Sequence, residues 1–191
     1  MTVSPVPARV LSDVLPVGLV RDAALVAGGA AFTGVLSQVL VPLPFTPVPL
    51  SLGTFAVLLT GAALGPLRGV LAMVLYLVAG MAGVPWFAGQ SSGWHEASFG
   101  YVLGYVLAAG LIGMMARRRA DRRPVSMLGA SLVAAAAVYV GGVPWLMVHL
   151  EVGLGQALLL GVVPFLVGDA IKAVAAAGLL PAAWRLLTRS R

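Results

Sequence analysis

The chain contains a single lysine, Lys172, which follows Asp169 by three residues in an otherwise apolar stretch. This spacing puts both side chains on one face of a helix. Each charge costs about 2.5–3.5 kcal/mol at the centre of a membrane helix, and packing alone does not require that cost. A carboxylate and an ammonium together suit a small ligand that has N–H groups and a carboxylate. The alternatives are a structural ion pair, or a lysine paired with a backbone carbonyl.

Phe165 lies four residues before Asp169, on the same helical stripe, where it could pack against an apolar part of a ligand. The helix is expected to start near Pro164, because proline is favoured in a first helical turn. A rise of 1.5 Å per residue then puts Asp169 about 7–8 Å and Lys172 about 12 Å below that point. We therefore expect a pocket in the outer half of a membrane, open to the outside.

Other polar residues give weaker signals. Candidates for additional hydrogen bonds are Tyr76, Tyr101, Tyr105, Gln90, Thr54 and Ser51, although each alone is typical of a packing residue. His95-Glu96 and His149 with Glu151 are too few for a metal site, which needs three or four converging ligands. The chain has no cysteine, no Gly-Lys-Ser/Thr phosphate loop, no His-Glu-x-x-His helix and no Gly-x-Ser-x-Gly elbow. A binding protein without metal or cofactor is therefore favoured over an enzyme.

The composition places these residues in a membrane. Of 191 residues, 60% are hydrophobic and 9% are charged, and the mean hydropathy is +1.02. Such a chain cannot cover its surface with polar groups, so a soluble monomer is excluded. Six apolar segments are predicted, at about 23–41, 50–65, 68–83, 99–116, 125–148 and 159–187. Together they predict an all-α membrane protein of one compact domain.

The arginines predict how the segments cross. All eleven lie before the first segment, at the junction of the second and third, between the fourth and fifth, or at the end of the chain from residue 185 on. Loops 42–49, 84–98 and 149–158 contain no lysine or arginine. The positive-inside rule therefore predicts six transmembrane helices with both termini in the cytoplasm. The predicted parts are an N-terminal cytoplasmic or interfacial segment at 1–22, a transmembrane domain at 23–187 and a tail at 188–191.

Two further patterns concern the ends and faces of these helices. Apolar Val10, Leu11, Val14 and Leu15 around Ser12 and Asp13 predict a short interfacial helix. The outer loops are rich in Pro, Gly and Trp, and Gly141, Gly142 and Pro144 extend this pattern into the third region. We interpret it as non-helical backbone around a pocket mouth, which a membrane tolerates only inside protein or beside a cavity. The alternative is ordinary interfacial loops with an aromatic belt.

Small residues recur every fourth position at Ala23, Ala27 and Ala31, which lets another helix approach closely. The stripe fits either internal packing or a docking surface for a partner subunit, and the residues alone favour internal packing. Gly100 and Gly104 form a similar pair, for which we also expect internal packing.

A set of motifs resembles the BioY family of biotin transporters. They are Pro44-Phe45-Thr46-Pro47-Val48-Pro49-Leu50, Leu64-Gly65-Pro66-Leu67-Arg68-Gly69, Tyr76-Leu77, Gly83-Val84-Pro85-Trp86-Phe87-Ala88-Gly89, Gly100-Tyr101-Val102-Leu103-Gly104-Tyr105, Gly142-Val143-Pro144-Trp145-Leu146 and Pro164-Phe165-x-x-Gly168-Asp169-x-x-Lys172. The resemblance runs from about Phe32 to Trp184. The family consists of substrate-capture (S) components of energy-coupling factor (ECF) transporters, with a six-helix fold.

The resemblance implies that biotin binds near the outer face. It also implies a transmembrane coupling subunit and two ATPase subunits as partners, in a bacterial plasma membrane. In related S components an Ala-x-x-x-Ala pattern on the first helix docks on the coupling subunit, and Ala23, Ala27 and Ala31 match it. Asp169 and Lys172 match ligand-binding residues of the family. The complete set of predicted ligand contacts is Asp169, Lys172, Tyr101, Gln90, Phe87, Trp86, Phe165, Ser91, Thr54 and Trp145.

The chain departs from the family pattern in two places. It has Gly53-Thr54 where Gln-Thr is expected, and Glu96-Ala97-Ser98-Phe99-Gly100-Tyr101 where many members have Gly-Pro-Thr-Gly-Gly-Tyr. We therefore expect Gln90 or Ser91 to supply the missing polar groups. Three other functions stay open on the residues alone: a solitary proton-coupled carrier with Asp169 as the relay, a small intramembrane hydrolase or transferase, and an assembly subunit that binds no ligand.

Overall fold

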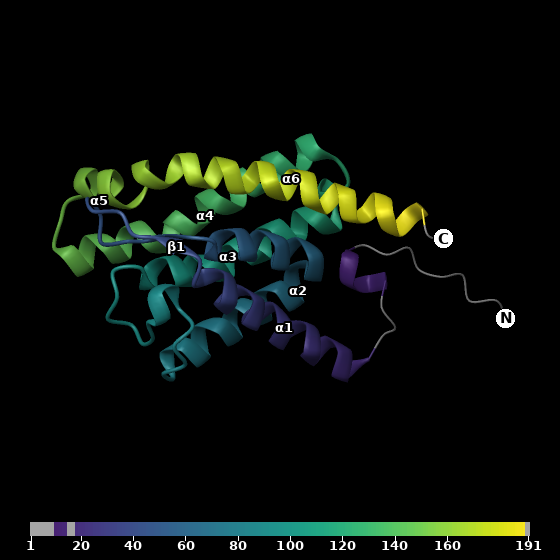
Figure 1. Ribbon diagram of the computed structural model, residues 1–191, viewed down its shortest axis with the longest axis horizontal. Coiled ribbons are helices and arrows are strands. Elements are labelled where there is room, and N and C mark those ends of the chain that lie inside the picture. Colours follow the sequence, from purple (N-terminus) through teal and green to yellow (C-terminus); the bar gives the residue numbers. More distant parts are fainter. Residues whose placement is uncertain (1–9, 15–17, 190–191) are drawn as a thin grey trace.

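Long apolar helices make up most of the protein (Figure 1), for which we analysed a computed structural model that describes residues 10–14 and 18–189. The long helices are α1 (Leu19–Ser37), α2 (Gly53–Met81), α3 (Phe99–Arg117), α4 (Pro124–Leu150) and α6 (Leu166–Arg189), and α5 (Leu154–Gly161) is short. Short 3-10 helices are η1 (Leu11–Val14), η2 (Ala88–Gln90), η3 (Ala120–Arg122) and η4 (Val163–Phe165). Strands β1 (Leu40–Val41) and β2 (Leu50–Ser51) form an antiparallel ribbon around loop 42–49.

Five helical stretches in the described residues are long and apolar enough to cross a membrane: Leu19–Ser37, Gly53–Met81, Phe99–Arg117, Pro124–Leu150 and Leu154–Leu187. The last stretch joins α5 to α6. The predicted all-helical membrane architecture is therefore confirmed. The number of stretches differs from the six predicted segments because α2 (Gly53–Met81) covers most of both segments 50–65 and 68–83.

The backbone of α2 is not helical at Gly65, where φ is 81° and ψ is 177°. Gly61 and Gly69 flank this point, and a Cβ atom at Gly69 would lie 3.0 Å from the Cα atom of Gly61. In a continuous helix, residues eight positions apart are separated by about 12 Å. The chain therefore turns back at Gly65, and residues 53–64 and 66–81 form two arms that lie side by side. Pro66 follows the turn and begins the second arm, a position that proline favours.

Other boundaries also differ from prediction. α1 begins at Leu19, four residues before the predicted start of the membrane domain, and ends at Ser37. The predicted short helix is present as η1, and Leu15 lies outside the described residues. The prediction of non-helical backbone around Gly141 and Gly142 was wrong, because α4 continues to Leu150.

These glycines serve helix packing instead. A Cβ atom at Gly141 would lie 2.5 Å from the carbonyl oxygen of Gly100, and one at Gly142 would lie 2.5 Å from the ring of Tyr101. The absence of side chains thus lets α3 and α4 approach closely. Gly104 packs on the backbone of Val138 in the same interface, so the predicted internal role of Gly100 and Gly104 is confirmed.

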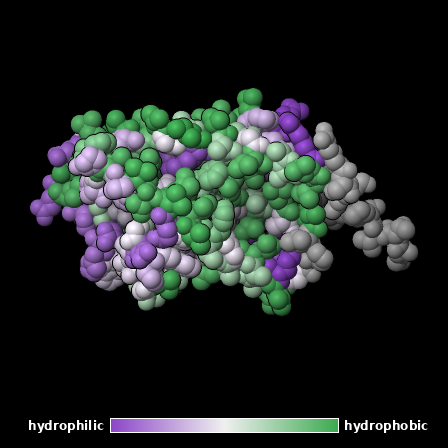
Figure 2. Space-filling view, viewed as in Figure 1, coloured by the Kyte–Doolittle hydropathy of each residue, from purple (hydrophilic) through white to green (hydrophobic). Residues whose placement is uncertain are grey.

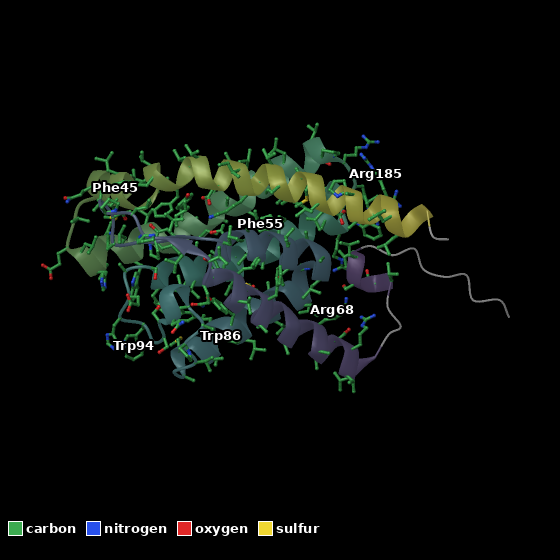
Figure 3. The ribbon with its side chains drawn as sticks, viewed as in Figure 1. Phe45, Phe55, Arg68, Trp86, Trp94 and Arg185 are labelled. Carbon is green, nitrogen blue, oxygen red and sulfur yellow. The ribbon has the colours of Figure 1, made fainter. Side chains whose placement is uncertain are left out.

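The two ends of the bundle differ in chemistry. One end, here called the loop end, carries loops 42–49 and 82–98. The other, the arginine end, carries the start of α1, the turn of α2 and the α3–α4 loop. Figure 3 shows Trp86 and Trp94 at the loop end and Arg68 and Arg185 at the arginine end. Much of the surface between the two ends is hydrophobic (Figure 2). This distribution suits a bundle whose sides face lipid.

Candidate ligand-binding site

A cavity opens among the helices near the loop end. Its volume is about 50 Å³, which is smaller than the range of about 300–1,000 Å³ usual for small-molecule sites. Its walls come from α1, loop 42–52, α2, loop 82–98, α3, α4 and the start of α6. They consist of Ser37, Val48, Pro49, Ser51, Thr54, Tyr76, Ala88, Ser98, Tyr101, Val102, Tyr105, Val138, Tyr139, Phe165, Asp169 and Lys172.

The charged part of the cavity is the Asp169–Lys172 pair. The Lys172 ammonium donates to Oδ1 of Asp169 at 3.2 Å, and the side chains of Lys172 and Asp169 are 8% and 12% exposed. The Tyr139 hydroxyl donates to the other carboxylate oxygen, Oδ2, at 2.5 Å. An ammonium has three N–H donors, and the structure shows one hydrogen bond from Lys172 within the described residues. Lys172 therefore retains donors for a ligand in the cavity.

A second polar region consists of hydroxyl groups around the first residue of α2, Gly53. A Cβ atom at Gly53 would lie 2.6 Å from the Tyr105 hydroxyl and 2.7 Å from the Ser37 hydroxyl, so only glycine leaves room for both. The Tyr105 hydroxyl interacts with Thr54 and Ser51. These hydroxyls give the cavity neutral hydrogen-bonding groups in addition to the charged pair.

Aromatic rings form the apolar wall. The Tyr101 ring meets Tyr139 edge to face at 6.2 Å and lies 6.3 Å from Phe165. The Tyr101 hydroxyl donates to the carbonyl oxygen of Gly161 at 2.8 Å, which ties α3 to the end of α5. The wall is thus fixed by contacts among α3, α4 and the segment that leads into α6.

Loop 82–98 is held against the cavity by Gln38, the residue after α1. The Gln38 side-chain NH₂ donates to the carbonyl oxygens of Trp86 and Phe87 at 2.9 and 3.1 Å. Its side-chain oxygen accepts from the backbone N–H of Gln90 at 2.9 Å. The Tyr76 hydroxyl also lies 3.1 Å from the carbonyl oxygen of Trp86, to which it donates, and 3.1 Å from the Ser37 hydroxyl. The end of α1 therefore contributes both to the cavity wall and to the position of this loop.

The structure brings together five of the ten predicted ligand contacts. Asp169, Lys172, Tyr101, Phe165 and Thr54 all line the cavity. The other five, Gln90, Ser91, Phe87, Trp86 and Trp145, do not line it.

The aromatic residues outside the cavity support its surroundings. Phe87 is buried between Tyr76 and Phe99. The Trp86 indole donates to the carbonyl oxygen of Tyr76 at 2.9 Å. The Trp145 indole donates to the carbonyl oxygen of Glu96 at 3.0 Å. These contacts stabilise loop 82–98 and its attachment to α4.

Gln90 and Ser91 belong to the turn of that loop. Gln90 has a left-handed backbone, with φ of 59°. The Ser91 hydroxyl donates to the carbonyl oxygen of Ala88 at 3.1 Å. Both residues thus shape the turn whose first residue, Ala88, reaches the cavity.

Several cavity residues were not predicted from the sequence, and two of them, Tyr139 and Ser37, make side-chain hydrogen bonds there. Tyr139 interrupts an apolar stretch of α4, and a single hydroxyl in such a stretch was a usable signal. Ser37 gave a weaker signal, because it lies at the end of its helix, where serine is common.

The alanine stripe of α1 faces away from the bundle. Ala23, Ala27 and Ala31 are exposed, whereas Gly29 and Gly34 pack against α2 and Trp86. Internal packing of the stripe, which the residues alone favoured, is therefore wrong. The inward face of α1 uses a different set of small residues.

Comparison with known proteins identifies the family. The model of the BioY family matches residues 6–189. A Pyrococcus horikoshii protein named "Probable biotin transporter BioY" is 35% identical over 159 residues, which are 82% of this chain and 91% of that protein. "Biotin transporter BioY" of Thermotoga maritima is 31% identical over 140 residues, which are 72% of this chain and 81% of that protein.

A solved structure shares the fold. It is described as the S-component for biotin from an ECF-type ABC transporter, and it matches with a TM-score of 0.77 at 23% identity, over 87% of this chain and 92% of that one. The predicted S-component-like bundle is thus confirmed at the level of fold. Because the family match extends over nearly the whole sequence, the chain belongs to the BioY family.

Proposed function

We propose that this multi-pass membrane protein captures biotin from outside a bacterial cell, as the S component of an ECF transporter in the plasma membrane. The observation that carries the proposal is the Asp169–Lys172 pair, which lines a cavity near the loop end of an apolar bundle. Relatives named biotin transporters support the choice of ligand. Capture needs no covalent step.

The proposed topology has six crossings with both termini in the cytoplasm. The two arms of α2 supply two crossings, since the chain reverses at Gly65. The arginines support the orientation, because Arg21, Arg68 and the arginines of the α3–α4 loop lie at one end. By the positive-inside rule this end faces the cytoplasm, and the loop end faces outwards.

The chemistry of the cavity suits biotin. Its ureido ring has N–H donors and a carbonyl acceptor, its thiophane ring is apolar, and its tail ends in a carboxylate. Asp169 accepts from N–H groups, Lys172 donates to a carbonyl or carboxylate oxygen, and Tyr101 with Phe165 covers the apolar ring. The hydroxyls of Ser37, Ser51, Thr54 and Tyr105 serve the other polar end.

Transport requires other chains. We infer that a transmembrane coupling subunit docks on the exposed alanine stripe of α1, and that two ATPase subunits drive reorientation. The exposure of Ala23, Ala27 and Ala31 supports this docking surface, because small side chains let a partner helix approach closely. A solitary proton-coupled carrier would instead accumulate biotin in cells that lack any coupling subunit.

Equilibrium binding of biotin tests the site. Lys172→Ala and Asp169→Asn should each weaken binding about 10- to 150-fold, the value of a hydrogen bond to a charged group. Asp121→Asn is the matched control, since Asp121 is also a buried carboxylate but lies in the α3–α4 loop at the arginine end. Tryptophan fluorescence would report binding, and circular dichroism in detergent would report folding. Unchanged affinity in both site variants would contradict the assignment.

A further inference from the structure

The end of α3 and the loop that leads to α4 together contain five arginines and one carboxylate. The arginines are residues 117, 118, 119, 122 and 123, and the acid is Asp121. The Asp121 side chain is 0% exposed, in contrast to the surrounding arginines. A carboxylate at this position would ordinarily reduce the positive charge that the loop presents to its surroundings. Because Asp121 is completely buried, its negative charge is not presented at the loop surface.

Asp121 is enclosed by α6 and by its neighbour in sequence. The Trp184 indole of α6 donates to Oδ2 of Asp121 at 2.5 Å. The Arg122 guanidinium stacks on the Trp184 ring, 3.2 Å from its centroid, and its Nε lies 3.6 Å from Oδ1 of Asp121. Arg122 and Asp121 therefore compensate each other's charge, and Trp184 contacts both: the Arg122 side chain is 28% exposed, against 0% for Asp121.

Hydrogen bonds fix the shape of the loop. Arg119 has a left-handed backbone with φ of 68°, and its N–H donates to the carbonyl oxygen of Ala116 at 2.8 Å. The Ser126 hydroxyl lies 2.8 and 3.0 Å from the carbonyl oxygens of Ala120 and Arg123. The backbone of the loop is thus fixed before a ligand binds, so binding has to order only the arginine side chains.

Four arginines point outwards from this scaffold: Arg117, Arg118, Arg119 and Arg123 are exposed, and none has an ion pair within the described residues. They lie within seven consecutive residues, so their fields add over distances comparable with the Debye length of about 8–10 Å. Arg185, next to Trp184, is exposed at the same end of the bundle (Figure 3). The exposed charged side chains of the loop are therefore all positive, although its sequence includes Asp121.

We propose that these four arginines bind the headgroups of anionic phospholipids. The loop lies where the apolar sides of the bundle end, which is the level of the headgroups of a bilayer. Guanidinium groups pair with phosphate oxygens in a bidentate way, and clusters of four or more basic residues beside a membrane helix favour anionic lipid. The ligand is thus a phosphodiester lipid that carries a net negative charge. The site lies apart from the biotin cavity and does not depend on the proposed transport.

Native mass spectrometry of the full chain in a neutral detergent tests this proposal. The probes are phosphatidylglycerol and phosphatidylcholine with identical acyl chains. We expect tighter binding of phosphatidylglycerol, and a loss of about fivefold for each exposed arginine removed, the effect of one basic residue near an anionic surface. Arg119→Gln should therefore weaken phosphatidylglycerol binding about fivefold, and the quadruple variant R117Q/R118Q/R119Q/R123Q should abolish the preference for it.

Arg122→Gln is the matched control, because it removes the same charge from the same loop but from the side stacked on Trp184. It should change phosphatidylglycerol binding by less than about twofold. An equal loss in Arg122→Gln and Arg119→Gln would overturn the proposal, because binding would then follow net charge alone. Equal affinity of the wild-type chain for both lipids would also overturn it.

Discussion

Tyr139 gives the carboxylate of Asp169 a fixed orientation. The Tyr139 hydroxyl donates to Oδ2 of Asp169, and Lys172 donates to Oδ1. Without this donor the carboxylate keeps only its contact with Lys172 and is free to rotate. Tyr139 comes from α4 and the charged pair comes from α6, so the hydrogen bond also fixes the two helices relative to each other.

Tyr139→Phe should therefore weaken biotin binding about 10- to 150-fold, because it removes a hydrogen bond to a charged group. Tyr76→Phe is the matched control: it removes a hydroxyl from the same cavity, but one that bonds only to neutral groups. Tyr76→Phe should weaken biotin binding only about 2- to 12-fold. Isothermal titration would measure both. If binding is weakened by Asp169→Asn but not by Tyr139→Phe, Tyr139 does not position the pair.

Burial raises the pKa of Asp121 above its ordinary value of 3.8. A carboxylate with a raised pKa stabilises the fold only while it is protonated. Its contribution is complete below pH 3.8 and is lost as the pH rises through the raised pKa. Asp121→Asn should therefore melt at a higher temperature than the wild type at pH 7, and the difference should shrink towards pH 4.

Melting temperatures in detergent between pH 4 and 8 would test this expectation. Glu151→Gln controls for the lost charge, because Glu151 is exposed after the end of α4. A lower melting temperature for Asp121→Asn at pH 7 would contradict it, and would mean that the contact with Arg122 outweighs the cost of burying the carboxylate.

Among the helices, α2 shows best what sequence can and cannot predict. Gly65 and Pro66 separated two apolar segments in the sequence, and the chain reverses at that point. The same two residue types misled the prediction around Gly141 and Pro144, where α4 continues without a break. The two glycines have different roles in the tertiary structure. Gly65 adopts a backbone conformation that other residues rarely adopt, whereas Gly141 leaves space for α3. A single sequence does not distinguish these two uses of glycine.

Gly65→Ala should destabilise the protein by about 1–3 kcal/mol, since its backbone region is almost exclusive to glycine. For a chain of this size each kcal/mol lowers the melting temperature by about 2–4 °C. Gly129→Ala is the matched control, because Gly129 lies within α4 with nothing within 4 Å of an added Cβ atom. It should be neutral or stabilising by up to about 1 kcal/mol. Equal melting temperatures for the two variants would contradict a strained turn at Gly65.

At the scale of the whole molecule, the charged pair and the arginines were the parts most accessible to sequence reasoning. A charge in an apolar segment is costly, so Asp169 and Lys172 stood out without any structure. The hydroxyl cluster around Gly53 could not be recognised in the sequence, because Ser37, Thr54 and Tyr105 come from three different helices. The outward direction of the alanine stripe also had to come from the structure, since α1 has small residues on both faces.

Ala27→Leu should leave biotin binding unchanged, because Ala27 lies outside the cavity, but it should weaken docking of the coupling subunit. Overpacking of an interface costs about 1–3 kcal/mol, or about 5- to 150-fold in affinity. Co-purification with the coupling subunit would measure the effect. Ala136→Leu on α4 is the matched control, because Ala136 is also exposed. Undiminished co-purification of Ala27→Leu would place the docking surface elsewhere.

Helix α1 connects the cavity, loop 82–98 and the alanine stripe. Ser37 lines the proposed ligand cavity, Gln38 contacts loop 82–98, and the alanine stripe lies on the same helix. Any tilt of α1 that accompanies docking must therefore alter the cavity. Thermodynamic reciprocity then requires that the coupling subunit change the affinity for biotin by the same factor by which biotin changes the affinity for the coupling subunit.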